Sequence, residues 1–157
     1  MNIRAMILLS ALCYCYLGTA LGDEPSNVIT AKRVFLEKMG AGRFDKLAEI
    51  YGEGFVAHGS SGDYTLDEDN ASGKEWRRAC PDLKVAVMRT VADADLVAVH
   101  WNAKCTNTVA AAGLPGLGGK ADVDGMTFFR FKEAKIVEEW SIIDIATMKR
   151  QLSVTSN

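Results

Sequence analysis

The sequence has few of the residues on which metal, phosphate and serine-nucleophile sites depend. Its two histidines, His58 and His100, are far apart and lie in no cluster of cysteines or carboxylates, so it predicts no metal site. The glycine-rich stretch at 113–119 lacks the lysine and hydroxyl residue that end a phosphate-binding loop. A Gly-x-Ser-x-Gly nucleophile motif is also missing. We therefore expect a protein without a bound cofactor or a serine nucleophile.

Features that nucleic acids and membranes require are missing as well. The 157 residues include 18 basic and 20 acidic side chains, and this balance provides no basic surface for nucleic acid. Beyond the first 22 residues, no apolar stretch is long enough to span a membrane. The sequence therefore predicts neither kind of partner for the domain that follows residue 22.

Residues 1–22 have the pattern of a secretory signal peptide. Arg4 gives a positive start, residues 5–17 are apolar, and small residues at 18–22 suit cleavage after Ala20 or Gly22. The alternative is an uncleaved membrane anchor, for which the apolar run is short and its flanks are wrong. We expect residues 23–157 to form one exported domain, secreted or periplasmic, with 17 basic and 20 acidic side chains.

Two of the four cysteines lie in this signal peptide and leave with it, so Cys80 and Cys105 remain. If the alternating segments at 83–91 and 96–106 form a hairpin, the two remaining sulfur atoms are near neighbours. In an oxidising compartment, we expect them to form a disulfide. The alternatives are two buried free thiols or a catalytic cysteine.

Hydrophobic periodicity predicts an α+β fold. The long predicted strands alternate with a period of two, as antiparallel strands with one buried face do. We expect a curved antiparallel sheet with the N-terminal helices packed on its concave face, and a small-molecule cavity between the two layers. Helices are expected at 26–39, 45–51, 65–78 and 146–152, and strands at 55–58, 83–91, 96–106, 125–132 and 135–143.

Short landmarks recur along the chain in a recognisable order. They are Phe-Val-Ala-His at 55–58, Pro-Asp-Leu at 81–83, Asp-x-Val-Ala-x-x-Trp at 95–101, Gly-Leu-Pro at 113–115, and an ending made of Arg130, Lys-Ile-Val-Glu at 135–138, Trp140, Asp144 and Gln-Leu at 151–152. This order resembles that of the SnoaL-like polyketide cyclases, also called ester cyclases, of the nuclear transport factor 2-like superfamily. The resemblance spans essentially all of residues 23–157.

The resemblance implies a cone-shaped α+β barrel and a cofactor-free aldol ring closure. In that reaction, the aspartate that matches Asp144 removes a proton from a carbon next to a carbonyl. An apolar cone disfavours a charged carboxylate, so the pKa of Asp144 is expected to rise towards the range of a general base. The competing interpretation is that Asp144 caps the helix that follows it, and the two roles are not exclusive.

Further residues are candidates to position a substrate beside Asp144. His58 would orient the substrate as a second catalytic residue, or else bond loop backbone. If a one-residue bulge follows the turn at 133–134, Arg130 and Phe128 share a face with Glu138, Trp140 and Asp144. Arg130 would then hold an enolate or carboxylate, or else pair across strands with Glu138. The alternative for His100 is a half-exposed histidine on a strand. The alternative for Trp140 and Phe128 is a packing position in the wall of the pocket or core. The substrate-binding candidates are Arg130, Trp140, Phe128, His100 and Asn107, the last two standing where relatives have an arginine and a histidine.

Two functions fit these features. The first is an exported enzyme that performs general acid–base chemistry on a small apolar carbonyl compound of the polyketide kind. The second is a non-catalytic binding module with the same cone. The outer face of the sheet is a candidate homodimer interface, and Asn70 begins an acceptor sequon for glycosylation of exported proteins.

Overall fold

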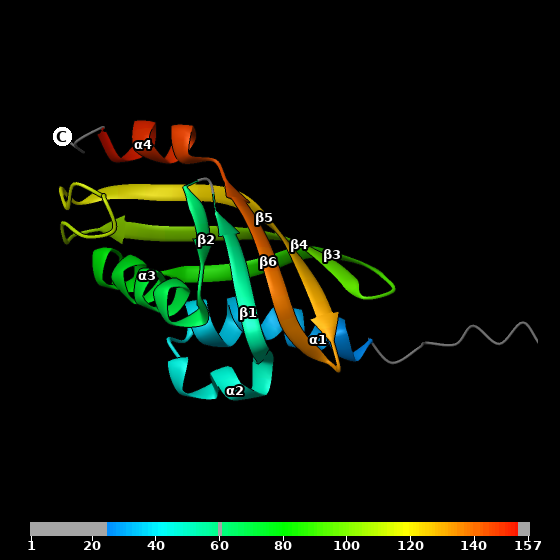
Figure 1. Ribbon diagram of the computed structural model, residues 1–157. Coiled ribbons are helices and arrows are strands. Elements are labelled where there is room, and N and C mark those ends of the chain that lie inside the picture. The colour runs from blue at the N-terminus through cyan, green and yellow to red at the C-terminus, as the bar shows by residue number, and fades with distance from the viewer. Residues whose placement is uncertain (1–24, 60, 154–157) are drawn as a thin grey trace, which may run out of the picture.

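The computed structural model describes residues 25–59 and 61–153. The signal peptide predicted at 1–22 lies outside the described residues. Six strands form one curved sheet in the order β2-β1-β6-β5-β4-β3 (Figure 1). Strands β3 to β6 are antiparallel neighbours, while β1 pairs with β6 in parallel. The strands are β1 (Tyr51–Gly59), β2 (Gly62–Tyr64), β3 (Lys84–Asp93), β4 (Leu96–Asn107), β5 (Gly119–Lys132) and β6 (Lys135–Ile143).

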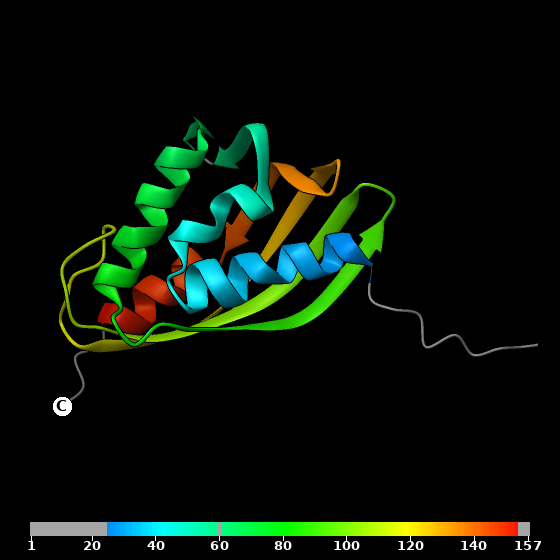
Figure 2. The same cartoon turned by 90° about the horizontal axis from the view of Figure 1, so that it is seen from below.

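Helices gather on one side of the long strands, as Figure 2 shows. The first, α1 (Ser26–Arg33), continues without a break as the π-helix η1 (Val34–Gly40). None of the helices within the described ranges is long and apolar enough to cross a membrane. The remaining helices are η2 (Phe44–Lys46), α2 (Leu47–Ile50), α3 (Leu66–Ala79) and α4 (Ile145–Ser153).

This architecture confirms the predicted α+β fold with helices on the concave face of a curved sheet. Several segments differ from expectation, among them the unpredicted strand β2 and the start of β5 at Gly119 in place of 125. The predicted helix at 26–39 changes to π-helix at Val34, and the short extended piece predicted at 55–58 belongs to the nine-residue strand β1. Pairing with β6 gives β1 backbone partners from Tyr51 onwards, and Gly54, at φ 72°, allows the shift of register between Tyr51 and Val56.

Helix α3 starts where the sequence predicts and has a packing reason for its internal glycine. Thr65 and Glu68 form a capping box, in which each side chain bonds the backbone N–H of the other residue. A Cβ on Gly73 would lie 3.2 Å from the ring of Phe44 and 3.3 Å from the sulfur of Met39. Glycine at this position therefore lets α3 pack closely against the segment that carries Met39 and Phe44.

A β-bulge in β6 decides which side chains of the last hairpin face the helices. Arg130 of β5 lies opposite Glu138, whereas the next residue, Phe131, lies opposite Ile136. Val137 is thus the extra residue of the bulge. Because side chains alternate along a strand, this extra residue reverses the faces of all β6 residues that follow it.

After the bulge, Glu139 and Ser141 point to the concave side. They share that side with Thr127 and the buried Phe129 of β5. Trp140, which lies opposite Phe128, belongs to the outer face. Beyond the bulge, β6 therefore presents Glu139 and Ser141 to the interior and Trp140 to the outside.

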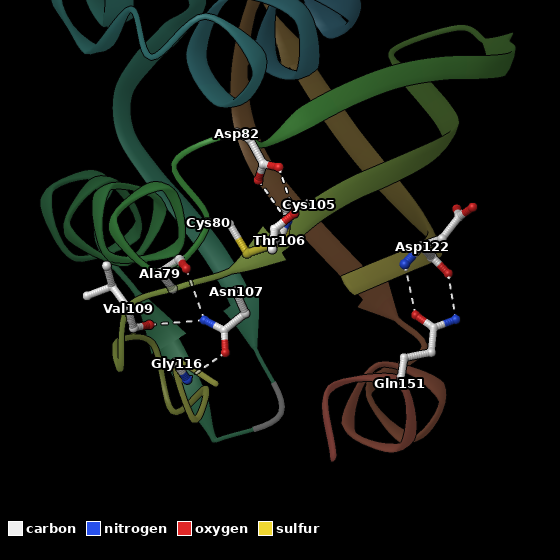
Figure 3. The surroundings of a disulfide bond; sticks show 10 residues. All are labelled: Ala79, Cys80, Asp82, Cys105, Thr106, Asn107, Val109, Gly116, Asp122 and Gln151. Atoms are coloured by element: carbon white, nitrogen blue, oxygen red, sulfur yellow. Dashed lines mark hydrogen bonds between the residues drawn. A yellow bond between two sulfur atoms is a disulfide. The ribbon is translucent and has the colours of Figure 1, made fainter. Parts of the chain in front are cut away.

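The predicted disulfide is present. Cys80, just after α3, and Cys105 on β4 are bonded, with their Cα atoms 5.6 Å apart (Figure 3). It links the end of α3 to the inner surface of the sheet. Beside it, the carboxylate of Asp82 accepts hydrogen bonds from the backbone and the hydroxyl of Thr106.

Asn107 lies next to this disulfide and has a structural role. Its buried side-chain amide donates hydrogen bonds to the carbonyls of Ala79 and Val109, at 2.9 and 3.0 Å. Its carbonyl accepts one from the backbone N–H of Gly116, at 2.7 Å. Asn107, a predicted substrate-binding residue, instead fixes the loop after β4 to the end of α3 (Figure 3).

Replacing both Cys80 and Cys105 with alanine is expected to lower the free energy of unfolding by about 3 kcal/mol. The reason is that the disulfide closes the chain between these two residues into a loop, which restricts the unfolded state. Denaturant titration measures the change. Reduction of the wild-type protein serves as the control and should lower the midpoint by a similar amount. An unchanged midpoint in both cases would contradict a stabilising disulfide.

Candidate active site

A cavity of about 220 Å³ lies between the helices and the concave face of the sheet. Its walls are largely apolar and come from η1, α3, α4 and the inner faces of β3 to β6. Phe35 stacks on Trp101 at 5.5 Å between ring centroids, and both rings line the cavity. Trp76, Leu83 and Met148 add further apolar wall. Such a space suits a small, mainly apolar molecule.

One end of this cavity is polar. Lys38 of η1 is only 2% exposed, and its ammonium donates hydrogen bonds to Asp69 of α3 and, at 3.0 Å, to the hydroxyl of Tyr51. The same ammonium lies 4.8 Å from the centroid of the Tyr51 ring. A buried charge is tolerated when it is paired and hydrogen-bonded in this way.

Glu139 completes the polar end, and a chain of hydroxyl groups orients its carboxylate. The indole N–H of Trp101 donates to Thr127 Oγ1 at 3.0 Å, Thr127 and Ser141 hydroxyls are 2.8 Å apart, and Ser141 donates to Glu139 Oε1 at 2.8 Å. Since the indole can only donate, the chain runs from Trp101 towards Glu139. Glu139 Oε2 is buried and has no hydrogen-bond partner among the described residues.

The surroundings of Glu139 raise its pKa to about 7. Burial disfavours the charged carboxylate most, and the negative charge of Asp69 adds to this effect. Lys38 and the hydrogen bond from Ser141 act in the opposite direction and are weaker. Near neutral pH, Glu139 can therefore both accept and return a proton, which general acid–base catalysis requires.

A second hollow, of about 460 Å³, adjoins the cavity at this polar end. It lies between β1, β2 and α3, and His58 and Tyr64 are part of its lining. Four residues border both spaces, so the hollow meets the cavity beside the carboxylate of Glu139. They are Asp69, Ser72, Glu139 and Ser141.

Asp144 lies outside the cavity, at the start of α4. Its exposed carboxylate accepts a hydrogen bond from the backbone N–H of Thr147 at 2.9 Å, and this bond lowers the pKa of Asp144. This geometry is the helix cap that was the competing interpretation. The shift is opposite in sign to the one expected for a general base in an apolar cone.

His58, Trp140 and Arg130 come together on the outer face. The His58 and Trp140 rings stack at 4.7 Å between centroids, and His58 Nδ1 lies 2.8 Å from a carboxylate oxygen of Asp63. Arg130 donates to Glu138 at 2.6 Å, which is the cross-strand ion pair considered above. Through β1, His58 also reaches the rim of the 460 Å³ hollow, so it lies closer to the cavity entrance than the other two.

His100 and Phe128 also face outwards. With Asp144, they line a third, open hollow of about 570 Å³ on the outer face of β3 to β6. His100 Nε2 lies 3.6 Å from a carboxylate oxygen of Asp124. The reason for this placement is register, because the alternate positions of β4 and β5 carry the buried side chains.

Sequence reasoning missed the polar end of the cavity. Lys38, Asp69 and Glu139 come from three separate segments, and no motif joins them. A weak signal was available at Lys38, which shares a helical stripe with Val34 and Phe35. For Glu139, strict alternation from Ile136 predicts the outer face, and only the bulge turns this residue inwards.

Two other features of the described residues bear on sites. No group of three or more histidine, cysteine, aspartate or glutamate side chains within them is arranged to hold a metal ion. Asn70, the acceptor in the sequon, is 6% exposed and buried on α3. In the folded chain it is therefore not accessible for glycosylation.

Comparisons with known proteins agree with this architecture. The model of the SnoaL-like polyketide cyclase family matches residues 29–152, so the chain belongs to this family. No curated protein sequence is significantly similar to the chain.

Solved structures of low sequence identity share the fold. A protein from Jannaschia sp. CCS1, assigned to the SnoaL-like polyketide cyclases, superposes with a TM-score of 0.76 at 22% identity, covering 86% of this chain and 99% of that one. IdmH from Streptomyces antibioticus, assigned as a polyketide cyclase, has a TM-score of 0.71 at 23% identity, covering 82% and 99%. A SnoaL-like polyketide cyclase from Agrobacterium tumefaciens strain C58 has a TM-score of 0.68 at 24% identity, covering 83% and 100%.

The raised pKa of Glu139 predicts a pH-dependent stability. A carboxyl group with a pKa of about 7 when folded and 4.5 when unfolded binds protons more tightly in the folded state, so wild-type stability falls as the pH rises between these values. Because glutamine does not titrate, the stability of the Glu139→Gln variant should lack the decrease that residue 139 causes between these pH values. Denaturant titrations of both proteins at several pH values test this, and a constant difference between them across the range would contradict the raised pKa.

Proposed function

We propose that this protein is a cofactor-free cyclase or isomerase that performs general acid–base chemistry on a small, largely apolar carbonyl compound of the polyketide kind. The observation that supports this most is Glu139. Its carboxylate lies at the polar end of an apolar cavity, has a pKa of about 7, and presents one oxygen without a partner. Membership of the SnoaL-like polyketide cyclase family supports the same class of reaction.

In the proposed reaction, Glu139 Oε2 takes a proton from a carbon next to a carbonyl group. The electrons of the broken C–H bond form an enolate. Attack of the enolate carbon on a second carbonyl of the same molecule closes a ring, and Glu139 returns the proton to the alkoxide oxygen that forms. Return of the proton to another carbon of the enolate gives an isomer instead. Ser141 donates to Oε1 and is itself held by Thr127 and Trp101, so Oε2 is the oxygen directed at the substrate.

We assign the proton transfer to Glu139 in place of Asp144, the base that the family resemblance implies. A base needs a desolvated carboxylate, and the hydrogen bond from Thr147 stabilises the charged form of Asp144. The substrate would enter through the hollow beside His58 and Tyr64, since that hollow meets the cavity at Glu139.

Glu139→Gln is expected to lower the rate of proton abstraction at least 100-fold, because positioned general bases typically contribute about 10²–10⁴-fold. The rate can be measured by NMR as deuterium exchange next to the carbonyl of a bicyclic ketone such as 2-tetralone. The wild-type rate should rise with pH through about 7, where Glu139 loses its proton.

Asp144→Asn is the matched control. It should retain exchange activity within about threefold, and weakening of the cap should cost at most about 1 kcal/mol of stability. Full activity of Glu139→Gln, or loss only in Asp144→Asn, would contradict the assignment. Binding of the ketone by the wild-type protein without exchange at any pH would instead support the non-catalytic binding module.

We also propose export, which the disulfide between Cys80 and Cys105 supports because such bonds persist in oxidising compartments. The expected mature protein begins at Leu21 or Asp23 and contains no free thiol. Intact-mass measurement under non-reducing conditions, on protein recovered from outside the cytoplasm, tests both points. A chain that keeps Met1 and reacts with a thiol reagent would contradict export.

A further inference from the structure

We propose that Lys38 binds the oxyanion that forms on the substrate when Glu139 removes a proton. This inference rests on the proposed function and assigns a second catalytic residue to the same site. Lys38 lines the cavity together with Glu139. At 2% exposure, it is less exposed than any other charged residue among those described.

The position of Lys38 is structurally costly, which points to a use for its charge. Lys38 lies in η1, and π-helical turns are rare and often occur at functional sites. An apolar residue at the same place would continue the stripe formed by Val34 and Phe35 and would need no partner. Replacing a buried ion pair by packed apolar residues is often neutral or stabilising, so stability alone gives no reason for a lysine here.

The contacts of Lys38 leave capacity for a ligand. An ammonium group has three N–H donors. Asp69 and the hydroxyl of Tyr51 accept two hydrogen bonds, and within the described part of the chain no third acceptor is bonded. A carbonyl oxygen in the cavity would be the third acceptor and would orient the adjacent carbon towards Glu139.

The same contacts hold the ammonium of Lys38 in place. Asp69 supplies a counter-charge, and burial raises the pKa of Tyr51 well above its usual value, so its phenol keeps its proton. Tyr51 therefore holds the ammonium in place without exchanging protons with it. The positive charge of Lys38 also reaches Glu139, since it opposes the rise in the pKa of that carboxyl.

The charges of this group fit the proposed step. When Glu139 takes the proton, one negative charge moves from its carboxylate to the oxygen of the substrate. The pair formed by Lys38 and Asp69 is unchanged, so the site gains no net charge. A fixed ammonium next to the new oxyanion stabilises it without reorganisation, and preorganised groups of this kind contribute strongly to catalysis.

The test uses 4-nitrophenol, whose ionised form absorbs visible light and resembles an enolate. The titration is done in the Glu139→Gln background, which carries the charges of the site after proton transfer. Saturating amounts of this variant should lower the pKa of the bound phenol by about one unit or more, as a neighbouring opposite charge does. Adding Lys38→Met should abolish the shift, whereas adding Lys38→Arg should keep part of it.

Lys74→Met is the matched control, because Lys74 is an exposed lysine of α3 that lies over the ring of Phe44. It should leave the shift unchanged. If Lys38→Met does not fold, Lys38→Met combined with Asp69→Asn, which removes both charges of the pair, is titrated instead. An equal shift with and without Lys38, or no shift in Glu139→Gln alone, would overturn the assignment.

Turnover provides a separate readout. In the otherwise wild-type protein, Lys38→Met should lower kcat for deuterium exchange at least tenfold with a smaller change in KM, since the oxyanion exists only after proton transfer. A phenol pKa that depends on Lys38, in a protein that exchanges no ketone proton, would contradict the proposed function and leave the oxyanion site in place. Exchange of the ketone proton without a phenol shift would support the proposed function and contradict the oxyanion site.

Discussion

The site depends on one irregularity of the backbone, the β-bulge at Val137. Without it, alternation from the buried Ile136 would turn Glu138 and Trp140 towards the helices and Glu139 towards solvent. The neighbouring strand accommodates this bulge at Gly52, where a Cβ would lie 3.1 Å from the Val137 side chain. The polar end of the cavity and the aromatic and ionic cluster on the outer face are thus two results of the same extra residue.

Charged side chains at the inner surface of the sheet are a cost to stability, because apolar residues packed in their place would often be at least as stable. Lys38, Asp69 and Glu139 lie at the polar end of the apolar cavity, and their side-chain hydrogen bonds are made with Tyr51, Ser141 and one another. The carboxylate of Glu139 has one oxygen that accepts a hydrogen bond from Ser141 and one buried oxygen without a partner in the described part of the chain. Such incomplete satisfaction disfavours folding and is typical of places where a ligand supplies the missing contact.

The sequence was sufficient for the fold and for the disulfide, because both depend on periodicity and on hairpin pairing over many residues. It was not sufficient for the site. Aromatic residues stand on both faces at Phe128 and Phe129, so hydrophobicity alone does not indicate which face of β5 is buried. A one-residue bulge was foreseeable in this hairpin, but the sequence does not show which face it turns inwards, and the face of Arg130 and Trp140 was expected there in place of Glu139. Lys38 becomes a site residue only through contacts with Asp69 and Tyr51, which are distant in the chain.

The position of the acid along β6 has a physical consequence. At a strand end that leads into a helix, as at Asp144, free backbone N–H groups of the first helical turn stabilise the charged carboxylate. In the middle of a strand, the backbone N–H groups are used in the sheet, so a side chain such as Glu139 meets only what the cavity offers. Here the cavity offers burial and a neighbouring carboxylate, and both raise the pKa of Glu139. Within one cone, the mid-strand position is therefore the better place for a base, and the strand end is the better place for a cap.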